Sequence, residues 1–240
     1  MRLQSVIQAI YPFSCVACDA PVEGAHGLCA ACWSDTGFIS GTICDACGAP
    51  LPGENDGSVV HCDDCLTTPR PWAHGRAVLT YQDVGRRLVL ALKHGDRTDL
   101  VPTLAGWMAK TARELVAHDT LIVPVPLHWT RLLRRRFNQA GLLAQSLGRA
   151  LGCEVCVDAL LRPKRTVLLD GHGRDARFAV LGGAITVHPK RRHLVKGRPI
   201  LLVDDVMTSG ATLSAASEAL LAAGAAKVSI VTLARVVKRP

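Results

Sequence analysis

Two sets of residues in this sequence have the types and spacing that chemistry requires, and the first is a group of cysteines near the N-terminus. Eight of the ten cysteines form four Cys-x-x-Cys pairs between residues 15 and 65. Each pair places two sulfurs on one tight turn, and two such turns complete the tetrahedral thiolate shell that Zn²⁺ prefers. The sequence therefore predicts two structural Zn²⁺ sites. The expected ligands are Cys15, Cys18, Cys29, Cys32, Cys44, Cys47, Cys62 and Cys65.

The four Cys-x-x-Cys pairs can combine into two zinc sites in two ways. Sequential pairing forms one ribbon from residues 15–32 and another from residues 44–65, whereas interleaved pairing threads one loop through another, so sequential pairing is favoured. His26 and His61 flank the clusters and could each replace a thiol, although we expect both at the surface. Closed tetrathiolate sites leave no open coordination position for catalysis, so we expect this segment to serve folding or docking.

The second set lies in residues 199–213, PILLVDDVMTSGATL. Apolar residues deliver Asp204 and Asp205 to the end of a predicted strand, and residues 208–212 turn directly into a helix. Gly210 allows a tight bend, and the loop N–H groups, the hydroxyls and the helix N-terminus then converge on one place, which suits a phosphate. The carboxylates would repel bare phosphate but accept hydrogen bonds from the vicinal hydroxyls of a ribose. This segment therefore predicts a site for a ribose 5-phosphate group.

Other interpretations of this segment are weaker. No G-x-x-x-x-G-K-[ST] motif occurs, so a P-loop nucleotide site is not supported. ILLVDD could open a response-regulator receiver domain, but that fold needs far more chain after its acidic pair than the 35 residues that follow Asp205. An acidic strand end could also be a solvated terminus without function, which the attached loop argues against.

The elements that must position these residues alternate between strand and helix. Short β-branched runs predict strands at residues 76–81, 121–125, 199–205 and 227–236. Amphipathic stretches predict helices at residues 84–95, 100–118, 139–152 and 212–224. This alternation favours an α/β fold with a mainly parallel sheet and helices on both faces. Ligands bind beyond the carboxyl ends of the strands in such sheets, which is where the acidic pair lies.

Charge divides the chain at the same place as the cysteines. Residues 1–72 carry two Lys or Arg against eight Asp or Glu, whereas the remainder carries 26 against 12. We therefore expect a double zinc ribbon module at residues 1–70 and an α/β domain at residues 71–240. A basic surface of this size favours anionic partners, either phosphorylated small molecules or nucleic acid.

Two basic clusters near the expected phosphate site could follow a nucleic-acid backbone. The first consists of Arg131, Arg134, Arg135 and Arg136, and the second of Lys190, Arg191, Arg192, His193, Lys196 and Arg198. Trp129 and Phe137 are the nearby aromatic residues that could stack on bases. Solvated loop charge that attracts a small phosphorylated ligand explains the same residues equally well.

Targeting and membrane signals are absent from the sequence. It contains no run of about 18 apolar residues, and its N-terminus lacks the basic, apolar and cleavage regions of a secretory signal. We therefore expect a soluble cytoplasmic protein without membrane insertion. In a reducing cytoplasm the paired cysteines are expected to bind metal rather than to form disulfides.

Together these motifs resemble the ComF family (ComFC/GntX-like proteins), which join an N-terminal zinc ribbon, often double, to a type I phosphoribosyltransferase fold. VDDVMTSGAT is similar to the signature with which that fold binds 5-phosphoribosyl 1-pyrophosphate (PRPP). VPVPLHWTRLLRRRFNQAGLLAQSLG and the KHGD of residues 93–96 extend the resemblance over nearly the whole chain.

The resemblance implies that PRPP binds together with Mg²⁺. The implied PRPP-binding residues are Val125, Pro126, Leu127, His128, Asp204, Asp205, Met207, Thr208, Ser209, Gly210, Ala211 and Thr212. The implied catalytic residues are Asp204, Asp205 and Arg177. In this scheme the acidic pair holds the ribose hydroxyls, the loop after residue 125 holds the pyrophosphate, and Arg177 lies in a mobile loop, residues 162–178, that closes over the ligand.

This sequence also departs from the family pattern. Arg136 stands where the family usually has glycine, and Leu169 and Val180 replace the Gln and Asn expected in the mobile loop. Two functions stay open. The protein could transfer a phosphoribosyl group to an unknown acceptor, or it could be a non-catalytic accessory protein for DNA uptake in natural competence that binds single-stranded DNA or partner proteins.

Overall fold

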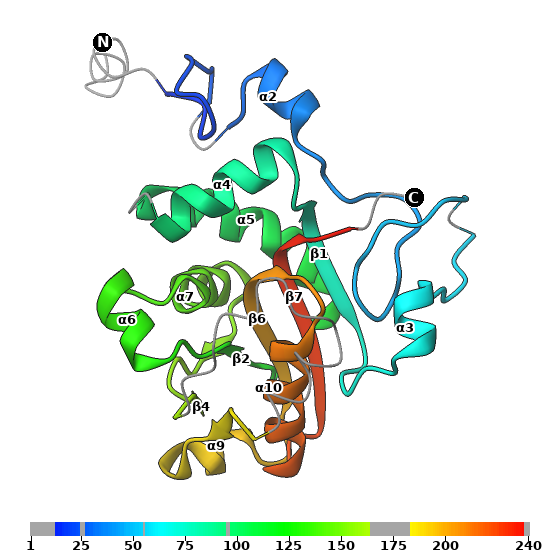
Figure 1. Ribbon diagram of the computed structural model, residues 1–240, viewed down its shortest axis with the longest axis vertical. Helices are drawn as coiled ribbons and strands as arrows, with labels where there is room; N and C mark the ends of the chain where they lie inside the picture. The colour runs from blue at the N-terminus through cyan, green and yellow to red at the C-terminus, as the bar shows by residue number, and fades with distance from the viewer. Residues whose placement is uncertain (1–12, 25–26, 55, 95–96, 164–182, 238–240) are drawn as a thin grey trace.

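A five-stranded parallel sheet forms the centre of the molecule. The computed structural model describes residues 13–24, 27–54, 56–94, 97–163 and 183–237. The strands lie in the order β1-β7-β6-β2-β3 (Figure 1), and every neighbouring pair is parallel. Their bounds are Gly75–Thr80 (β1), Leu121–Pro124 (β2), Glu154–Val155 (β3), Pro199–Met207 (β6) and Lys227–Arg235 (β7). The predicted α/β fold with a mainly parallel sheet is confirmed.

Helices cover both faces of this sheet. One face packs against α4 (Asp83–His94), α5 (Val101–Ala112) and α7 (Gln139–Leu151), and the other packs against α10 (Ala211–Ala222). The predicted helix at residues 100–118 is shorter than expected, because α5 ends at Ala112 and a 3₁₀ turn, η2 (Arg113–Leu115), leads to extended backbone at Val116. The shorter helical segments are α2 (Ala30–Asp35), α3 (Asp63–Thr67), α6 (Trp129–Arg135), α9 (Arg192–Val195), η1 (Thr98–Leu100) and η3 (Pro189–Arg191).

The central strand β6 shows why its sequence is a continuous apolar run. Ile200 and Leu202 pack in the cluster that contains α10, whereas Leu201 and Val203 pack in the cluster that contains α4, α5 and α7. Successive side chains of a strand point to opposite faces, so a strand covered on both faces has no polar side. The apolar run stops at Asp204, where the strand reaches the carboxyl edge of the sheet. A separate antiparallel pair, β4 (Leu160–Leu161) and β5 (Thr186–Val187), lies outside the main sheet.

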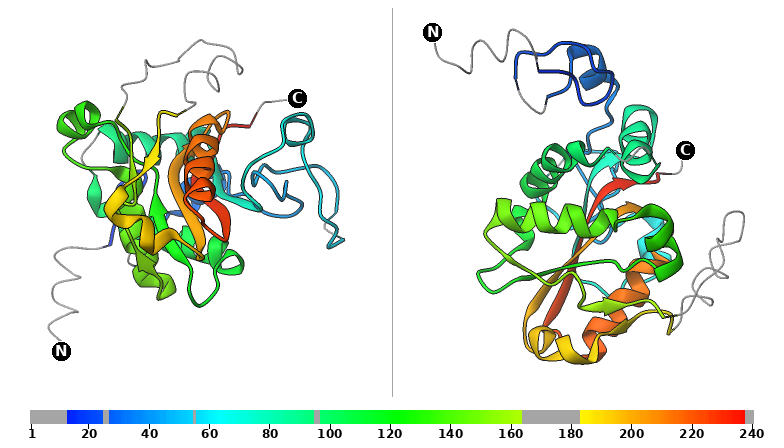
Figure 2. Two further views of the ribbon diagram at one scale, coloured as in Figure 1. Left: turned by 90° about the horizontal axis from the view of Figure 1, so that it is seen from below. Right: turned by 90° about the vertical axis from the view of Figure 1, so that its left-hand side faces the viewer.

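The two cysteine-rich segments contact the α/β domain at different places (Figures 1 and 2). The first lies beside α4, and its Phe38 packs edge-on against Trp107 of α5. The second docks on the edge strand β1, where Gly75 N donates to Asp45 O at 2.8 Å. The approach is close enough that a β-carbon at Gly48 would lie 2.5 Å from Ala77 N. The division of the chain at residue 70 stays a prediction.

The helices of the described ranges are too short or too polar to cross a lipid bilayer.

Candidate functional site

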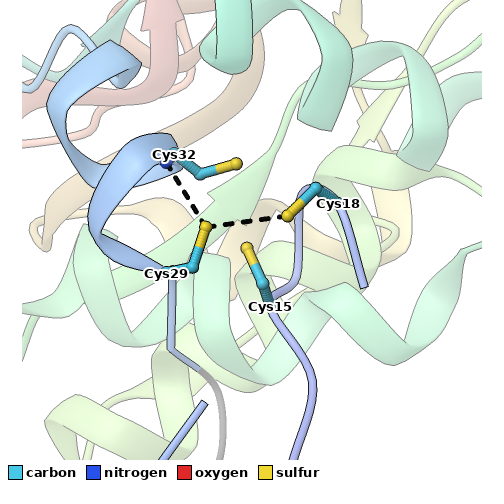
Figure 3. A group of neighbouring side chains, drawn as sticks. All are labelled: Cys15, Cys18, Cys29 and Cys32. Atoms are coloured by element: carbon cyan, nitrogen blue, oxygen red, sulfur yellow. Dashed lines mark hydrogen bonds between the residues drawn. The ribbon is translucent and has the colours of Figure 1, made fainter. Parts of the chain in front are cut away.

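The eight cysteine sulfurs gather in two groups. The Sγ atoms of each group lie within 4.8 Å of one another, and Figure 3 shows how those of the first group converge. The first group consists of Cys15, Cys18, Cys29 and Cys32, and the second of Cys44, Cys47, Cys62 and Cys65. The favoured sequential pairing is confirmed. Within the described residues, no histidine joins either group; His61 stays outside both, and His26 falls outside the described ranges.

The spacing of the sulfurs fits zinc. All ten cysteines are free, so no disulfide competes for these thiols. Four thiolates at about 2.3 Å from a tetrahedral Zn²⁺ lie about 3.8 Å from one another. The Sγ atoms of Cys18 and Cys29 are 3.6 Å apart, and those of Cys47 and Cys62 are 3.7 Å apart. Both groups can therefore hold Zn²⁺ with little rearrangement.

The loop from Thr208 to Gly210 joins β6 to α10 and has the geometry of an anion cradle. Gly210 has φ 84°, a conformation that glycine adopts freely and other residues rarely adopt, so the turn favours glycine; a β-carbon there would also lie 2.7 Å from Met207 Cε. Among the described residues, no acceptor takes the N–H groups of Thr208, Ser209 or Gly210. These donors, followed at once by the start of α10, can bind an anion. The strand runs two residues further than predicted, to Met207, and α10 begins at Ala211.

The acidic pair lies at the carboxyl end of β6, beside this loop. Asp205 is buried and pairs with Lys93 of α4, whose Nζ is 3.1 Å from Asp205 Oδ1. Asp204 is half-buried, and its Oδ1 accepts the N–H of Asp205 at 2.9 Å. Burial, together with the neighbouring Asp205 carboxylate, raises the pKa of Asp204 to about 7, and the charges of Lys93 and Arg162 oppose the rise. The site is thus prepared for a ligand that supplies hydroxyl donors or a cation to two crowded carboxylates.

The loop after β2 lies next to the end of β6. Val125 continues the parallel pairing, since its N–H donates to Val203 O at 2.9 Å, and Asn138 Nδ2 donates to Val125 O at 3.0 Å. The imidazole of His128 is buried, and its Nδ1 accepts the N–H of Thr130 at 3.3 Å. His128 therefore caps α6 and helps to fix the start of that helix.

Arg136, which departs from the family pattern, ends α6 in a left-handed conformation with φ 66° and ψ −20°. A side chain is disfavoured there by contact between its β-carbon and the following carbonyl, whereas glycine adopts the conformation freely. The usual family glycine thus has a local physical reason at this position.

Three residues that were not assigned to the site contact it in the structure. Lys93 appeared only as part of the KHGD motif, and Arg70 and Arg235 carried no motif at all. Arg235 Nη1 donates to Thr208 O at 2.6 Å, and Arg70 Nη1 donates to Ser209 O at 3.0 Å. No local sequence signal marks these two arginines, because each meets the loop from a distant part of the chain.

Other predicted site residues fall elsewhere. Arg177, Leu169 and Val180 lie outside the described residues, as do the side chains of Arg131 and Arg134. The second basic cluster was expected near the phosphate site, and that expectation is wrong. Its residues precede β6 around α9, at the opposite end of the sheet from the phosphate loop (Figure 1). The nine-residue strand between them spans roughly 27 Å.

Comparisons with known proteins match both parts of the chain. Residues 6–66 match the model of the double zinc ribbon domain, and residues 143–240 match that of the phosphoribosyl transferase domain. A solved structure of glutamine PRPP amidotransferase from B. subtilis, complexed with ADP and GMP, has a TM-score of 0.41 and 16% identity, and covers 60% of this chain and 30% of that one. The domain match and the strand order, rather than this distant likeness, identify the phosphoribosyltransferase-type fold.

Several curated proteins are similar over almost their whole length. DNA utilization protein YhgH of Escherichia coli K12 is 31% identical over 231 residues, which cover 93% of this chain and 97% of that protein. Competence protein F of Haemophilus influenzae is 29% identical, with coverage of 94% and 98%. Competence protein ComFC of Bacillus subtilis is 28% identical, with coverage of 87% and 84%. Sequence, cysteine geometry and sheet topology agree with these matches, and the chain belongs to the ComF family of proteins with a double zinc ribbon and a phosphoribosyltransferase-type domain.

Proposed function

We propose that this protein binds PRPP with Mg²⁺ at the carboxyl end of β6 and transfers its phosphoribosyl group to an acceptor that is still unknown. The observation that carries the proposal is the adjacency of two crowded carboxylates and a loop whose N–H groups are free among the described residues. Asp204 and Asp205 would accept hydrogen bonds from the ribose hydroxyls. Residues 208–212 would hold the 5-phosphate, and residues 125–128 the pyrophosphate.

In this proposal the protein supplies position and charge rather than a covalent nucleophile. The acceptor displaces pyrophosphate at the anomeric carbon, with bond breaking ahead of bond making. Mg²⁺ held near Asp204 and Asp205 would supply positive charge against the charge that develops on the leaving pyrophosphate. Lys93 pairs with Asp205 and balances part of the negative charge of the acidic pair. Arg177 stays the predicted cation of the closing loop. The free thiols favour a reducing compartment, and we propose the cytoplasm.

Calorimetric titration of the zinc-loaded protein with PRPP and Mg²⁺ tests the site. We expect binding by the parent protein and its loss in the Asp204→Asn/Asp205→Asn double variant, because the amides cannot balance Mg²⁺ or accept as strongly from hydroxyls. Asp99→Asn is the matched control, since Asp99 is an exposed carboxylate that pairs with Arg97 rather than with a residue of the site. Absence of PRPP binding by the folded parent would overturn the proposal. Release of pyrophosphate in the presence of candidate acceptors then tests turnover.

A second candidate function is the handling of single-stranded DNA, and the surface of α6 favours it. Trp129 and Leu133 are 62% and 72% exposed on this helix, which also carries basic residues at its end. An exposed tryptophan beside cations can stack on a base while the cations contact phosphates. The relatives named for DNA utilization and competence support this second candidate function.

Fluorescence anisotropy with a labelled single-stranded oligonucleotide tests this candidate. We expect Trp129→Ala to weaken binding by about 1–3 kcal/mol and Arg136→Ala to reduce the dependence of affinity on salt. Trp107→Ala is unsuitable as a control because Trp107 packs against Phe38, so Leu161→Ala, at another exposed apolar position, serves instead. Equal affinity in the parent and the Trp129→Ala variant would exclude α6 as the DNA surface.

A further inference from the structure

We propose that Arg70 and Arg235 are positioning residues that connect the second cysteine group to the phosphate loop, so that the loop keeps its anion-binding shape only while that group holds zinc. The second cysteine group is Cys44, Cys47, Cys62 and Cys65, and the phosphate loop is Thr208 to Gly210. The ligand assigned to the loop rests on the proposed function, whereas the mechanical connection does not.

Arg235 lies at the end of β7, and its side chain is only 4% exposed. Its Nη1 donates to Thr208 O at 2.6 Å and to Met207 O at 3.3 Å. Its Nη2 lies 4.0 Å from Cys47 Sγ. One guanidinium therefore touches the phosphate loop on one side and a zinc-ligand sulfur on the other.

Arg70 makes the same kind of connection from another part of the chain. Its Nε donates to Cys65 Sγ at 3.5 Å, and its Nη1 donates to Ser209 O at 3.0 Å. The guanidinium lies 5.6 Å from the centre of the Trp72 ring, which is itself held by a hydrogen bond from Nε1 to Ala46 O. Arg70 and Arg235 thus each connect the second cysteine group to the phosphate loop.

The charges of these arginines need a counter-charge. Each lies beside a sulfur of the second cysteine group, Arg70 beside Cys65 and Arg235 beside Cys47. A buried guanidinium without a counter-charge is costly. A zinc ion with four thiolates carries excess negative charge, and the metal also holds the four sulfurs of such a small segment in one arrangement. Zinc binding at the second group therefore supplies the negative charge that holds both arginines in place.

The arginines in turn determine which way the loop amides point. A peptide group is planar and trans, so its N–H points away from its C=O. The carbonyls held by the arginines belong to Thr208 and Ser209, and the same two peptide groups carry the N–H groups of Ser209 and Gly210. Met207 O is 3.3 Å from Arg235 Nη1 but also accepts the N–H of Val236 at 2.9 Å. Fixing the carbonyls toward the zinc ribbon directs these N–H groups to the opposite side, where no described acceptor takes them.

Backbone ¹⁵N order parameters of the loop test the connection without any ligand. For Thr208 to Gly210 we expect values near about 0.85 in the zinc-loaded parent and below about 0.6 in Cys62→Ser, which removes a ligand from the second group. Cys18→Ser removes a ligand from the first group and is expected to leave the loop ordered. An ordered loop in Cys62→Ser, or a disordered loop in both variants, would contradict a specific link to the second group.

Variants of Arg70 then test whether the arginine positions the loop when the zinc site itself is intact. Arg70→Ala should keep two zinc ions per chain yet disorder the loop and weaken PRPP binding at least about tenfold. Arg70→Lys should not restore binding, because one ammonium cannot reach Cys65 Sγ and Ser209 O together. Full rescue by lysine would mean that Arg70 acts only through its charge on the ligand, and the proposal would fall.

Arg198→Ala is the matched control for these variants. Arg198 also joins a backbone carbonyl, Asp119 O, to a side chain, Glu154, but at the opposite end of β6. We expect its loss to leave the loop and PRPP binding unchanged. If the parent protein binds no PRPP, the proposed function fails, while the order parameters of the Arg70 and Cys62 variants still decide whether the arginines position the loop.

Discussion

At the scale of single residues, Asp204 shows how binding is set against stability. Its pKa is raised to about 7 in the folded protein by burial and by the neighbouring Asp205 carboxylate. The folded state therefore holds a proton that the unfolded state releases at lower pH. Between the ordinary pKa of an aspartate and about 7, the free energy of unfolding falls as pH rises, and the full penalty is present above that range.

We predict that Asp204→Asn raises the free energy of unfolding near pH 8 by about 1–3 kcal/mol, a value reduced to allow for the partial exposure of Asp204. The gain should shrink on going to pH 5, because the carboxyl group is then protonated in the folded parent. Asparagine can still accept the N–H of Asp205 through its side-chain oxygen. Urea titrations at both pH values measure the difference.

The control for this prediction is Asp99→Asn. The guanidinium of Arg97 lowers the pKa of Asp99, so Asp99→Asn is expected to change the free energy of unfolding in the opposite direction. Because both side chains are exposed, the change should be near zero. A lower unfolding free energy for Asp204→Asn near pH 8 would show that the Asp204 carboxylate is stabilising rather than strained.

Arg136 gives a second prediction at this scale. Its left-handed conformation, with φ 66°, favours glycine. We expect Arg136→Gly to raise the free energy of unfolding by about 1 kcal/mol, because the strain of the β-carbon is removed. Leu133→Gly, at an exposed position inside the same helix, should lower it by about 1 kcal/mol, because glycine is disfavoured within a helix. Thermal melts of both variants check the opposite signs.

At the scale of elements, the loop between β6 and α10 depends on the absence of a side chain at Gly210. We predict that Gly210→Ala weakens PRPP binding at least about tenfold, because a β-carbon there strains the backbone. The added β-carbon would also lie 3.2 Å from Arg70 Nη1 and 3.3 Å from Trp72 Cη2. Calorimetry measures the binding loss.

Gly152→Ala separates backbone strain from damage to the loop. Gly152 ends α7 with φ 69°, and no atom outside its immediate chain neighbours lies within 4 Å of a β-carbon built there. Both variants carry the strain of a β-carbon at positive φ, so a loss of stability is expected from both. PRPP affinity should fall only for Gly210→Ala; an equal fall in both variants would trace the effect to global destabilisation.

The elements themselves were largely predictable, because hydrophobic periodicity and turn residues act locally. The run that forms β6, the glycine turn and the small-residue helix α10 all follow from neighbouring residues. The positions of Arg70 and Arg235 were not predictable, since they meet the loop across 139 and 27 positions of sequence. The second basic cluster was misplaced for a related reason. Proximity in sequence to β6 does not show which end of the strand a residue occupies.

At the scale of the whole molecule, the second ribbon covers part of the α/β domain. Trp72 is buried against Ala46, and Asp45 pairs with Arg76 at 3.1 Å on the edge strand β1. A chain that starts at residue 71 would expose this surface and leave Arg235 without its sulfur contact. The ribbon therefore contributes to the stability of the sheet to which it is joined.

We predict that removing residues 1–70 lowers the melting temperature by several degrees, consistent with a loss of roughly 1–3 kcal/mol. Removing only residues 1–35, which contain the first cysteine group, should cost much less, because the contact between Ile39 N and Val78 O is retained. Differential scanning calorimetry of both truncated chains measures this. Equal melting temperatures for the chain from residue 71 and the full chain would establish an autonomous domain.

The position of β7 also determines when this protein can fold during its synthesis. Among the described strands, β1 pairs within the sheet only with β7, which ends at Arg235. Until β7 has been synthesised and has left the ribosomal exit tunnel, β1 has no partner and the second ribbon has no finished edge to dock against. Domains usually fold in order from the N-terminus as they emerge. Here the sheet closes, and the phosphate loop gains Arg235, only after β7 has emerged, long after β1.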